Sequence, residues 1–184
     1  IFFILIGAAL FSQSWYVLGL YSEGRTMGIF VGGLGLLSLA AIMFAPMVLT
    51  GGDVVSSSDH LAEITVVKLL IVVWALYAVG VAVHGLWDFD ERAIGFYCAF
   101  LAVVTLVPFL YFANELQPIG TRYNEGVGLS LSAATLVLTA LAGILFFYLA
   151  FAFNILRLVA GWGLLLGGGV VTVIGLVIIS TVIT

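Results

Sequence analysis

The sequence predicts an all-α membrane protein, a bundle of six transmembrane helices that forms a single domain over residues 1–184. Hydrophobic residues make up 64% of the chain, charged residues only 8%, and the mean hydropathy is +1.34. A soluble domain carries about a quarter charged residues, so lipid must cover most of this surface. The apolar runs are continuous and lack the ten-residue alternation that is typical of membrane β-barrels.

Polar breaks divide the chain into six apolar segments. A spanning helix needs about 20 residues at 1.5 Å each to cross a hydrocarbon core of about 30 Å. The segments are expected at 1–20, 26–49, 62–84, 92–113, 127–153 and 160–184. We expect Ser58 and Asp59 to cap the third helix, and Pro118 and Gly120 to form a turn before the fifth. The first segment has no basic region or small-residue cleavage site, so it is interpreted as a spanning helix and not as a signal peptide.

Basic residues predict the orientation of the helices. Cytoplasmic loops of membrane proteins carry an excess of Lys and Arg. The first, third and fifth loops hold Arg25, Arg92 and Arg157, whereas Arg122 and Lys68 lie toward the other side. This difference places the odd-numbered loops in the cytoplasm and both termini outside. The expected location is the cytoplasmic (inner) membrane of a bacterium or archaeon.

Glycine pairs four residues apart predict close helix contacts. The chain has 22 glycines, among them the pairs Gly28 and Gly32, and Gly163 and Gly167. Small residues at this spacing let two helix backbones approach closely in lipid. The dense glycine run over 161–169 predicts a very tight contact or a kink in the last helix.

Several classes of function are excluded at this level. The net charge of −4 is spread over loops, so no nucleic-acid partner is expected. Cys98 is the only cysteine, which excludes an internal disulfide and a multi-cysteine metal site. The sequence offers no nucleophile–base–acid constellation, so we expect neither an enzyme nor a bound cofactor or metal. Ion pumps and coupled carriers keep ionisable groups near the middle of the membrane, and these segments hold none there. A solute that crosses this protein is therefore expected to be neutral.

Uncharged polar and aromatic side chains occupy the segments instead. Gln13 is the most informative, because an amide in hydrocarbon must find partners. Trp74 and Tyr77 are three residues apart and share one helix face. Pores for neutral solutes combine an aromatic bore with a few hydrogen-bonding groups. The alternative is that these side chains serve only the packing of the helices. Ser and Thr hydroxyls in a membrane usually bond the backbone of their own helix, and this holds as an expectation for Ser12, Ser14, Thr105, Ser130, Ser132, Thr135 and Thr139.

Two groups of titratable residues lie near helix ends. Asp59, His60 and Glu63 are candidates for proton-dependent gating on the outer face, since a histidine beside carboxylates titrates near neutrality. His84 forms a second group with Asp88, Asp90 and Glu91 on the inner face. The alternative interpretation of both groups is a solvated rim.

Three stretches resemble the AmiS/UreI family of amide and urea channels. Residues 27–34, MGIFVGGL, are similar to the family's "MNxFVGGL" at its second helix, and residues 90–102, DERAIGFYCAFLA, to its "DGRGLGWFSLFVA". Residues 150–158, AFAFNILRL, resemble the end of its fifth helix. The resemblance implies a passive channel for urea or a short amide in each protomer, and a homohexameric ring around a lipid plug.

The resemblance also implies which residues line the bore, on the first, third and fifth helices. These positions, together with Gln13 from the argument above, are Phe3, Ile6, Leu10, Trp74, Tyr77, Ala140, Gly143 and Phe147. The urea-channel branch has tryptophans at the three positions of the fifth helix, and its acidic residues are replaced here by Gly167 and Phe153. A bore of different shape is expected. The alternative is a structural subunit of a membrane complex, without a pore, in which small residues close the centre.

Overall fold

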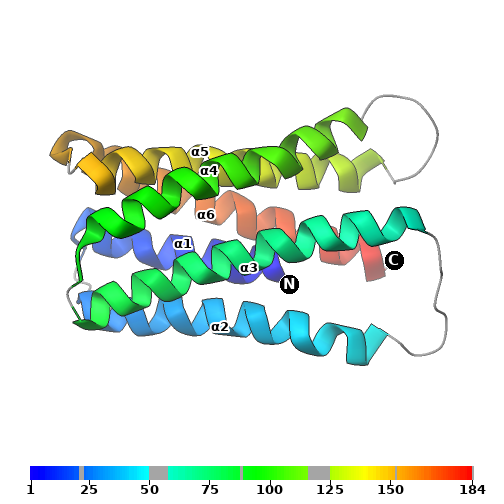
Figure 1. Ribbon diagram of the computed structural model, residues 1–184, viewed down its shortest axis with the longest axis horizontal. Helices are drawn as coiled ribbons and strands as arrows, with labels where there is room; N and C mark the ends of the chain where they lie inside the picture. The colour runs from blue at the N-terminus through cyan, green and yellow to red at the C-terminus, as the bar shows by residue number, and fades with distance from the viewer. Residues whose placement is uncertain (21–22, 50–57, 88, 116–124, 152, 184) are drawn as a thin grey trace.

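The computed structural model describes residues 1–20, 23–49, 58–87, 89–115, 125–151 and 153–183, and Figure 1 shows their arrangement. These residues form six antiparallel helices and contain no strand. The helices are α1 (Phe2–Leu18), α2 (Gly24–Leu49), α3 (Ser58–Trp87), α4 (Glu91–Glu115), α5 (Glu125–Phe151) and α6 (Asn154–Ile183). The predicted all-α class and the number of helices are confirmed.

Five of the helices, α2 to α6, are long and apolar enough to cross a membrane. The described α1 has 17 residues and is equally apolar in character, but it is shorter than the usual span. A helix of this length measures about 25 Å. The chain is therefore a multi-pass membrane protein.

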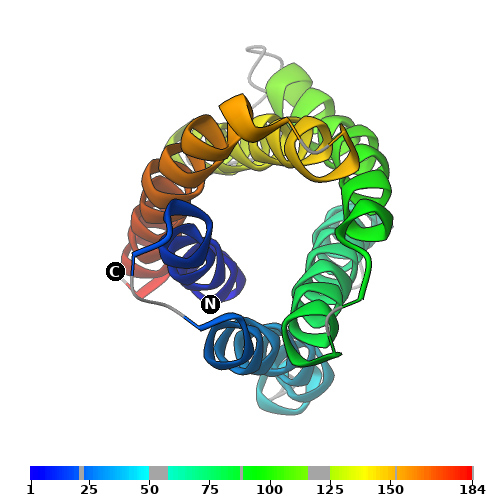
Figure 2. The same ribbon diagram turned by 90° about the vertical axis from the view of Figure 1, so that its left-hand side faces the viewer.

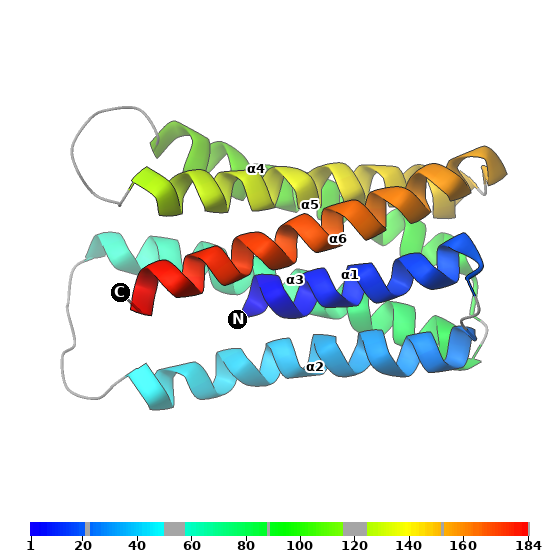
Figure 3. The same ribbon diagram turned by 180° about the vertical axis from the view of Figure 1, so that it is seen from behind.

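The six helices form a closed ring in chain order around a central axis (Figure 2). Each helix packs against the next one in the sequence, and α6 closes the ring against α1. The most extensive contacts join α4 with α5, α1 with α6, and α2 with α3. Views from the two sides show that both chain ends lie toward one end of the bundle (Figures 1 and 3). We call the other end, where α1, α3 and α5 finish, the Gly19 end.

The Gly19 end of α1 is fixed by a left-handed residue and by α6. Gly19 has φ 75° and ψ 25°, a conformation in which glycine carries no steric cost. The N–H of Leu20 donates to the carbonyl of Trp15 at 2.9 Å, which satisfies one of the last free carbonyls of the helix. Arg157 of α6 donates from Nε to the carbonyl of Val17 at 2.7 Å. A cation is thus held against the negative end of the α1 dipole.

The start of α6 corrects one predicted boundary. Residues 154–159 were expected to form a loop, but they belong to the first turns of α6, which begins at Asn154. Hydropathy marks where a segment leaves the hydrocarbon region, whereas backbone hydrogen bonds decide where a helix begins. The long side chain of Arg157 reaches back from this turn to α1. Helix α3 likewise extends beyond the expected 62–84 at both ends.

Glycine lets the helix pairs of the ring approach closely. In α2, Gly28 and Gly32 lie against Ala82 of α3: a Cβ added at Gly32 would come within 2.5 Å of the Ala82 methyl group. In α6, Gly168 lies against the backbone of α1, where an added Cβ would be 2.7 Å from the nitrogen of Phe11. The tight contact expected from the run 161–169 is therefore present. It joins α6 to α1, and Gly167 packs instead on the Leu141 side chain of α5.

Candidate functional site

The inner face of α1 carries four of the predicted residues. Phe3, Ile6, Leu10 and Gln13 follow one another at spacings of three and four residues, which places them on one stripe of the helix. All four are buried, with exposed fractions of 7%, 1%, 1% and 5%. This stripe packs in the interior of the ring, so the predicted positions on α1 are brought together.

The centre of the ring holds a hydrogen bond between two helices. The Tyr77 hydroxyl of α3 donates to Oε1 of Gln13 on α1 at 2.9 Å. The two residues are 64 positions apart in the chain and both are buried. Gln13 thus meets the partner that its placement in hydrocarbon requires.

Trp74 lies beside Tyr77 and is fixed by α4. Its ring contacts the Tyr77 ring edge to face, with centroids 5.5 Å apart. The indole N–H donates to the Thr105 hydroxyl at 3.2 Å, and Thr105 donates onward to the carbonyl of Leu101 at 2.6 Å. Trp74, Tyr77 and Thr105 are each at most 1% exposed. These side chains, together with Leu10 and Leu70, close the middle of the ring in this conformation.

The hydroxyls of buried or partly buried Ser and Thr mostly bond their own helices. Each donates to a backbone carbonyl three or four residues earlier, as seen at Ser12, Ser14, Ser38, Thr105, Thr135, Thr139 and Thr172. Such local bonds satisfy the hydroxyl without involving a neighbouring helix. Gln13 differs from all of them because its hydrogen bond reaches another helix.

A small cavity extends along the axis from Gln13 toward the Gly19 end. Its space of about 30 Å³ accommodates one or two water molecules. Five helices contribute to its wall, which consists of Gln13, Tyr16, Val17, Met27, Val81, His84, Glu91, Ile94, Tyr148 and Leu149. Polar groups therefore occur at both of its limits, with Gln13 on the inner side and His84 and Glu91 on the outer side.

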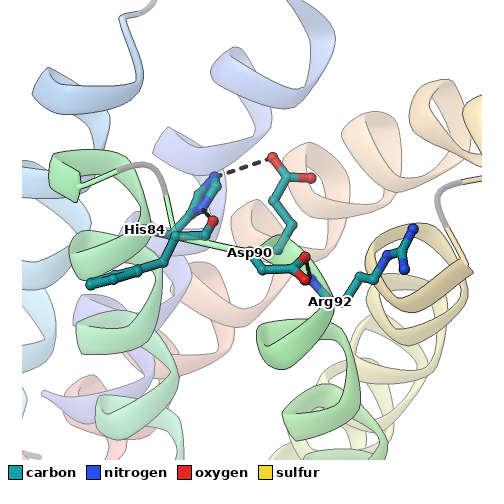
Figure 4. Close-up of polar contacts among 5 residues, drawn as sticks. His84, Asp90 and Arg92 are labelled. Atoms are coloured by element: carbon teal, nitrogen blue, oxygen red, sulfur yellow. Dashed lines mark hydrogen bonds and ion pairs between the residues drawn. The ribbon is translucent and has the colours of Figure 1, made fainter.

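A contact between His84 and Glu91 joins α3 and α4 at the outer limit of the cavity (Figure 4). His84 Nε2 lies 3.1 Å from Oε1 of Glu91, and His84 Nδ1 lies within hydrogen-bond distance of the carbonyl oxygen of Phe89. Asp90 caps α4 by accepting the N–H of Arg92 at 3.0 Å. Of the residues grouped in the sequence, His84 and Glu91 are therefore in contact, whereas Asp90 bonds the start of its own helix and Asp88 lies outside the described residues.

The three predicted pore-lining positions on α5 face the outside of the helix ring. Ala140 is exposed, a Cβ added at Gly143 would meet nothing within 4 Å, and Phe147 is 50% exposed. The buried face of α5 consists instead of Ser132, Ala134, Thr135, Leu138, Leu141, Ala142 and Leu145. Ala140, Gly143 and Phe147 therefore do not line the interior of this bundle. Both faces of a membrane helix are apolar, so hydropathy carries no signal for the rotation of α5.

The side chains of the candidate gating residues lie outside the described part of the chain. Asp59, His60 and Glu63 belong to the first turns of α3, at the end opposite to the cavity. Among the described His, Cys, Asp and Glu side chains, no group of three or more could hold a metal ion.

Sequence reasoning missed part of the cavity wall. Met27, Val81 and Leu149 are apolar residues in apolar segments, and nothing in the sequence distinguishes them from residues that face lipid. Tyr148 carried a usable signal: it is a tyrosine inside a span, one position after the Phe147 that the resemblance selected. One residue rotates a side chain by about 100° around a helix.

Comparison with known proteins gives no family for the chain: no protein-family model, curated protein or solved structure matches it.

Proposed function

We propose that this protein is a passive membrane channel for a small neutral solute such as urea or a short-chain amide. The observation that carries the proposal is the Gln13–Tyr77 hydrogen bond on the axis of a closed helix ring, reached by a cavity with polar groups at its limits. A pair of polar side chains in the centre of a membrane bundle is costly unless its hydrogen bonds are satisfied, and such pairs often serve the passage of a solute. The resemblance of residues 27–34 and 90–102 to amide and urea channels also supports the proposed channel function.

The lack of charged side chains among the described buried residues favours a neutral solute. No Asp, Glu, Lys, Arg or His is among the buried residues of the described chain. A permeating ion would need such groups or an ordered ring of carbonyls to replace its water. An amide needs only a few donors and acceptors, which the centre of the ring offers.

The proposed path follows the axis of the ring. Solute would pass between Phe3, Ile6, Leu10 and Gln13 of α1 and Trp74 and Tyr77 of α3. Because these side chains fill the middle, passage requires Gln13 and Tyr77 to separate. With the odd-numbered loops in the cytoplasm, the cavity faces the cell interior and both termini lie outside.

We further propose that six protomers form a ring in the cytoplasmic membrane of a bacterium or archaeon, with lipid at its centre. The large apolar side chains on the outside of α4, among them Phe96, Phe100, Val103 and Val107, are 52–66% exposed in one chain. Lipid or a second protomer can cover such a surface in a membrane.

A solute-flux measurement tests the channel. Pure protein in liposomes should carry urea and acetamide faster than empty liposomes in stopped-flow swelling. Val81→Trp replaces a buried isopropyl group in the cavity wall by an indole ring, and it should slow both solutes because it narrows the cavity. Gly143→Trp is the matched control: it adds the same ring on the outer face and should leave the flux unchanged.

The filled centre also supports a second candidate, a structural subunit of a membrane complex without a pore. Trp74, Tyr77, Leu70 and Leu10 are at most 1% exposed, as in a packed core. Protein with a verified fold but no excess flux of urea, acetamide, propionamide or glycerol, at neutral and at acid pH, would establish this alternative over the channel.

A further inference from the structure

We infer that a groove between α1 and α2, at the Gly19 end, binds one phospholipid whose headgroup carries a primary ammonium group, such as phosphatidylethanolamine. The groove lies on the outside of the helix ring, where α1 and α2 run side by side (Figure 3). It is separate from the axial cavity. The inference therefore concerns a second site and does not depend on the proposed channel.

The groove is large and reaches deep between the two helices. It encloses about 740 Å³, within the range of about 300–1,000 Å³ that is typical of sites for small organic ligands. Met27 lies at its floor, is only 4% exposed, and also belongs to the wall of the axial cavity. The groove therefore extends from the outer surface of the ring to the wall of its interior.

The groove exists because α1 and α2 are held apart by a large side chain. The contacts of α1 with α6 and of α2 with α3 are more extensive, and glycines meet the backbone of the partner helix there. Between α1 and α2, Gly24 instead meets the aromatic ring of Tyr16, where an added Cβ would be 3.3 Å from the nearest ring carbon. A ring between two helices prevents the close backbone approach that small residues allow.

The walls of the groove are apolar and mostly aromatic. Phe11 and Trp15 lie one turn apart on α1, with ring centroids 6.3 Å from each other, and Phe30 belongs to the wall on α2. These three side chains are 38–57% exposed. At 1.5 Å per residue, Phe11 and Phe30 lie about 10 Å from the ends of their helices. An acyl chain that enters the hydrocarbon region from the headgroup level can lie against these rings.

The mouth of the groove is polar. Glu23 directly precedes α2, Thr26 follows three residues later on the same side, and both are exposed. Within the described part of the chain, the Glu23 carboxylate forms no ion pair and the Thr26 hydroxyl forms no hydrogen bond. A primary ammonium group can donate to the carboxylate, and the hydroxyl can donate to a phosphate oxygen. The mouth therefore complements a zwitterionic headgroup.

The charge of Glu23 distinguishes this occupant from others. A helix of a second copy laid over the groove would take the carboxylate out of water, which is costly without a paired cation. A lipid headgroup leaves the carboxylate at the aqueous surface. An anionic lipid such as phosphatidylglycerol would bring a second negative charge to Glu23, and the quaternary ammonium of phosphatidylcholine has no N–H to donate. A lipid with a primary ammonium group fits both the groove and its mouth.

Tryptophan fluorescence tests the site, because Trp15 lies in the groove wall. One double variant, Trp87→Phe with Trp162→Phe, keeps Trp15. Its matched control, Trp15→Phe with Trp87→Phe, keeps Trp162, which is similarly exposed but lies on α6 outside the groove. Trp74 stays in both, since it has no exposed surface for a lipid to reach.

The quenchers are phospholipids brominated near the ester end of one chain, with ethanolamine, choline or glycerol headgroups, in bilayers of otherwise equal composition. At Trp15 the ethanolamine lipid should bind about three- to fivefold more strongly than the glycerol lipid, the size expected of an exposed ion pair. The choline lipid should bind less strongly than the ethanolamine lipid. At Trp162 the three lipids should quench alike.

Glu23→Gln should abolish the preference at Trp15. Asp90→Asn is the charge control: it removes a carboxylate at the same end of the bundle, outside the groove, and keeps a residue that can cap α4. The preference should survive in that variant. Equal quenching by the three lipids at Trp15, or a preference that persists in Glu23→Gln, would overturn the inference. Quenching at Trp162 with none at Trp15 would also overturn it and would show that another protein chain covers the groove.

Discussion

At the scale of single residues, the hydrogen bond from Trp74 to Thr105 decides how the aromatic centre is oriented. Trp74 has no exposed surface, so its N–H depends on a protein partner. Thr105 supplies that partner while its own hydroxyl proton is bound to Leu101. A short chain of donors therefore links α3 to α4 beside the proposed solute path.

Thr105→Val should destabilise the fold by about 1–3 kcal/mol, because it leaves the buried N–H of Trp74 unpaired at nearly constant side-chain volume. Thermal unfolding in detergent, followed by circular dichroism, measures the effect. Thr139→Val is the matched control: Thr139 donates only to the carbonyl of Thr135 in its own helix, so its loss should cost much less. Equal losses in the two variants would show that Thr105 contributes nothing through Trp74.

At the scale of helices, close backbone approach defines the ring. Lipid chains are as apolar as leucine, so helices in a membrane gain little from burying large apolar side chains against each other. Small residues allow many short contacts instead, as between α1 and α6 at Gly7, Gly168 and Gly175. The closure of the ring between the first and last helices depends on these positions.

Gly168→Ala should weaken the α1–α6 contact, because the added methyl group would lie 2.7 Å from the Phe11 nitrogen and 2.8 Å from the carbonyl oxygen of Gly7. Overpacking of this kind costs about 1–3 kcal/mol. Gly169→Ala, one position along, meets nothing within 4 Å and should be neutral or slightly stabilising, since alanine favours helix. Unfolding midpoints in detergent compare the two. If Gly169→Ala is the more harmful change, the packing of α6 described here is wrong.

The rotation of α5 gives a second prediction at this scale. Nitroxide labels at positions 143 and 147 should be accessible to oxygen and inaccessible to a water-soluble nickel chelate, because both positions face outward. Labels at 138 and 145 should be shielded from both reagents, as Leu138 and Leu145 are at most 1% exposed. Electron paramagnetic resonance in bilayers measures both accessibilities. Strong access of the nickel chelate at 143 and 147 would place these positions on an aqueous bore, as the family resemblance implies.

At the scale of the whole molecule, the six helices of one chain form the interior of the ring, and no residue of a second chain contributes to it. Each helix contacts its neighbours in chain order, and the central polar pair comes from α1 and α3 of the same chain. A channel in each protomer is compatible with this arrangement. The outer aromatic and aliphatic surface is left for lipid or for other copies of the chain.

The proposed hexamer predicts a defined mass for the purified protein. Native mass spectrometry from a mild detergent should show six chains of 19.5 kDa each, together with bound lipid. A change from Phe100, which is 52% exposed, to Glu should disperse the complex if α4 contributes to the contact, because a buried carboxylate at the interface is unfavourable. A monomer for the unmodified chain under conditions that preserve its fold would refute the hexamer and leave the channel of a single chain intact.

Much of the fold could be predicted because it follows from solvent and chain length. The six apolar segments, their approximate bounds and the alternation of helix direction depend on hydropathy and on a fixed rise per residue. Gln13 could also be singled out, since an amide in hydrocarbon requires a partner whatever the fold. A close helix contact at Gly28 and Gly32 could be predicted from their spacing, whereas their partner, α3, came from the structure.

Only the tertiary structure decided which faces meet. It selected Tyr77 as the partner of Gln13, Thr105 as that of Trp74, and Val17 as that of Arg157. It also turned Ala140, Gly143 and Phe147 outward and brought Tyr148 and Val81 to the cavity. The physical reason is that membrane helices are apolar on the side toward lipid and on the side toward the core alike. Composition therefore determines that a helix spans, while its rotation is determined by small residues and by the few polar groups that must find each other.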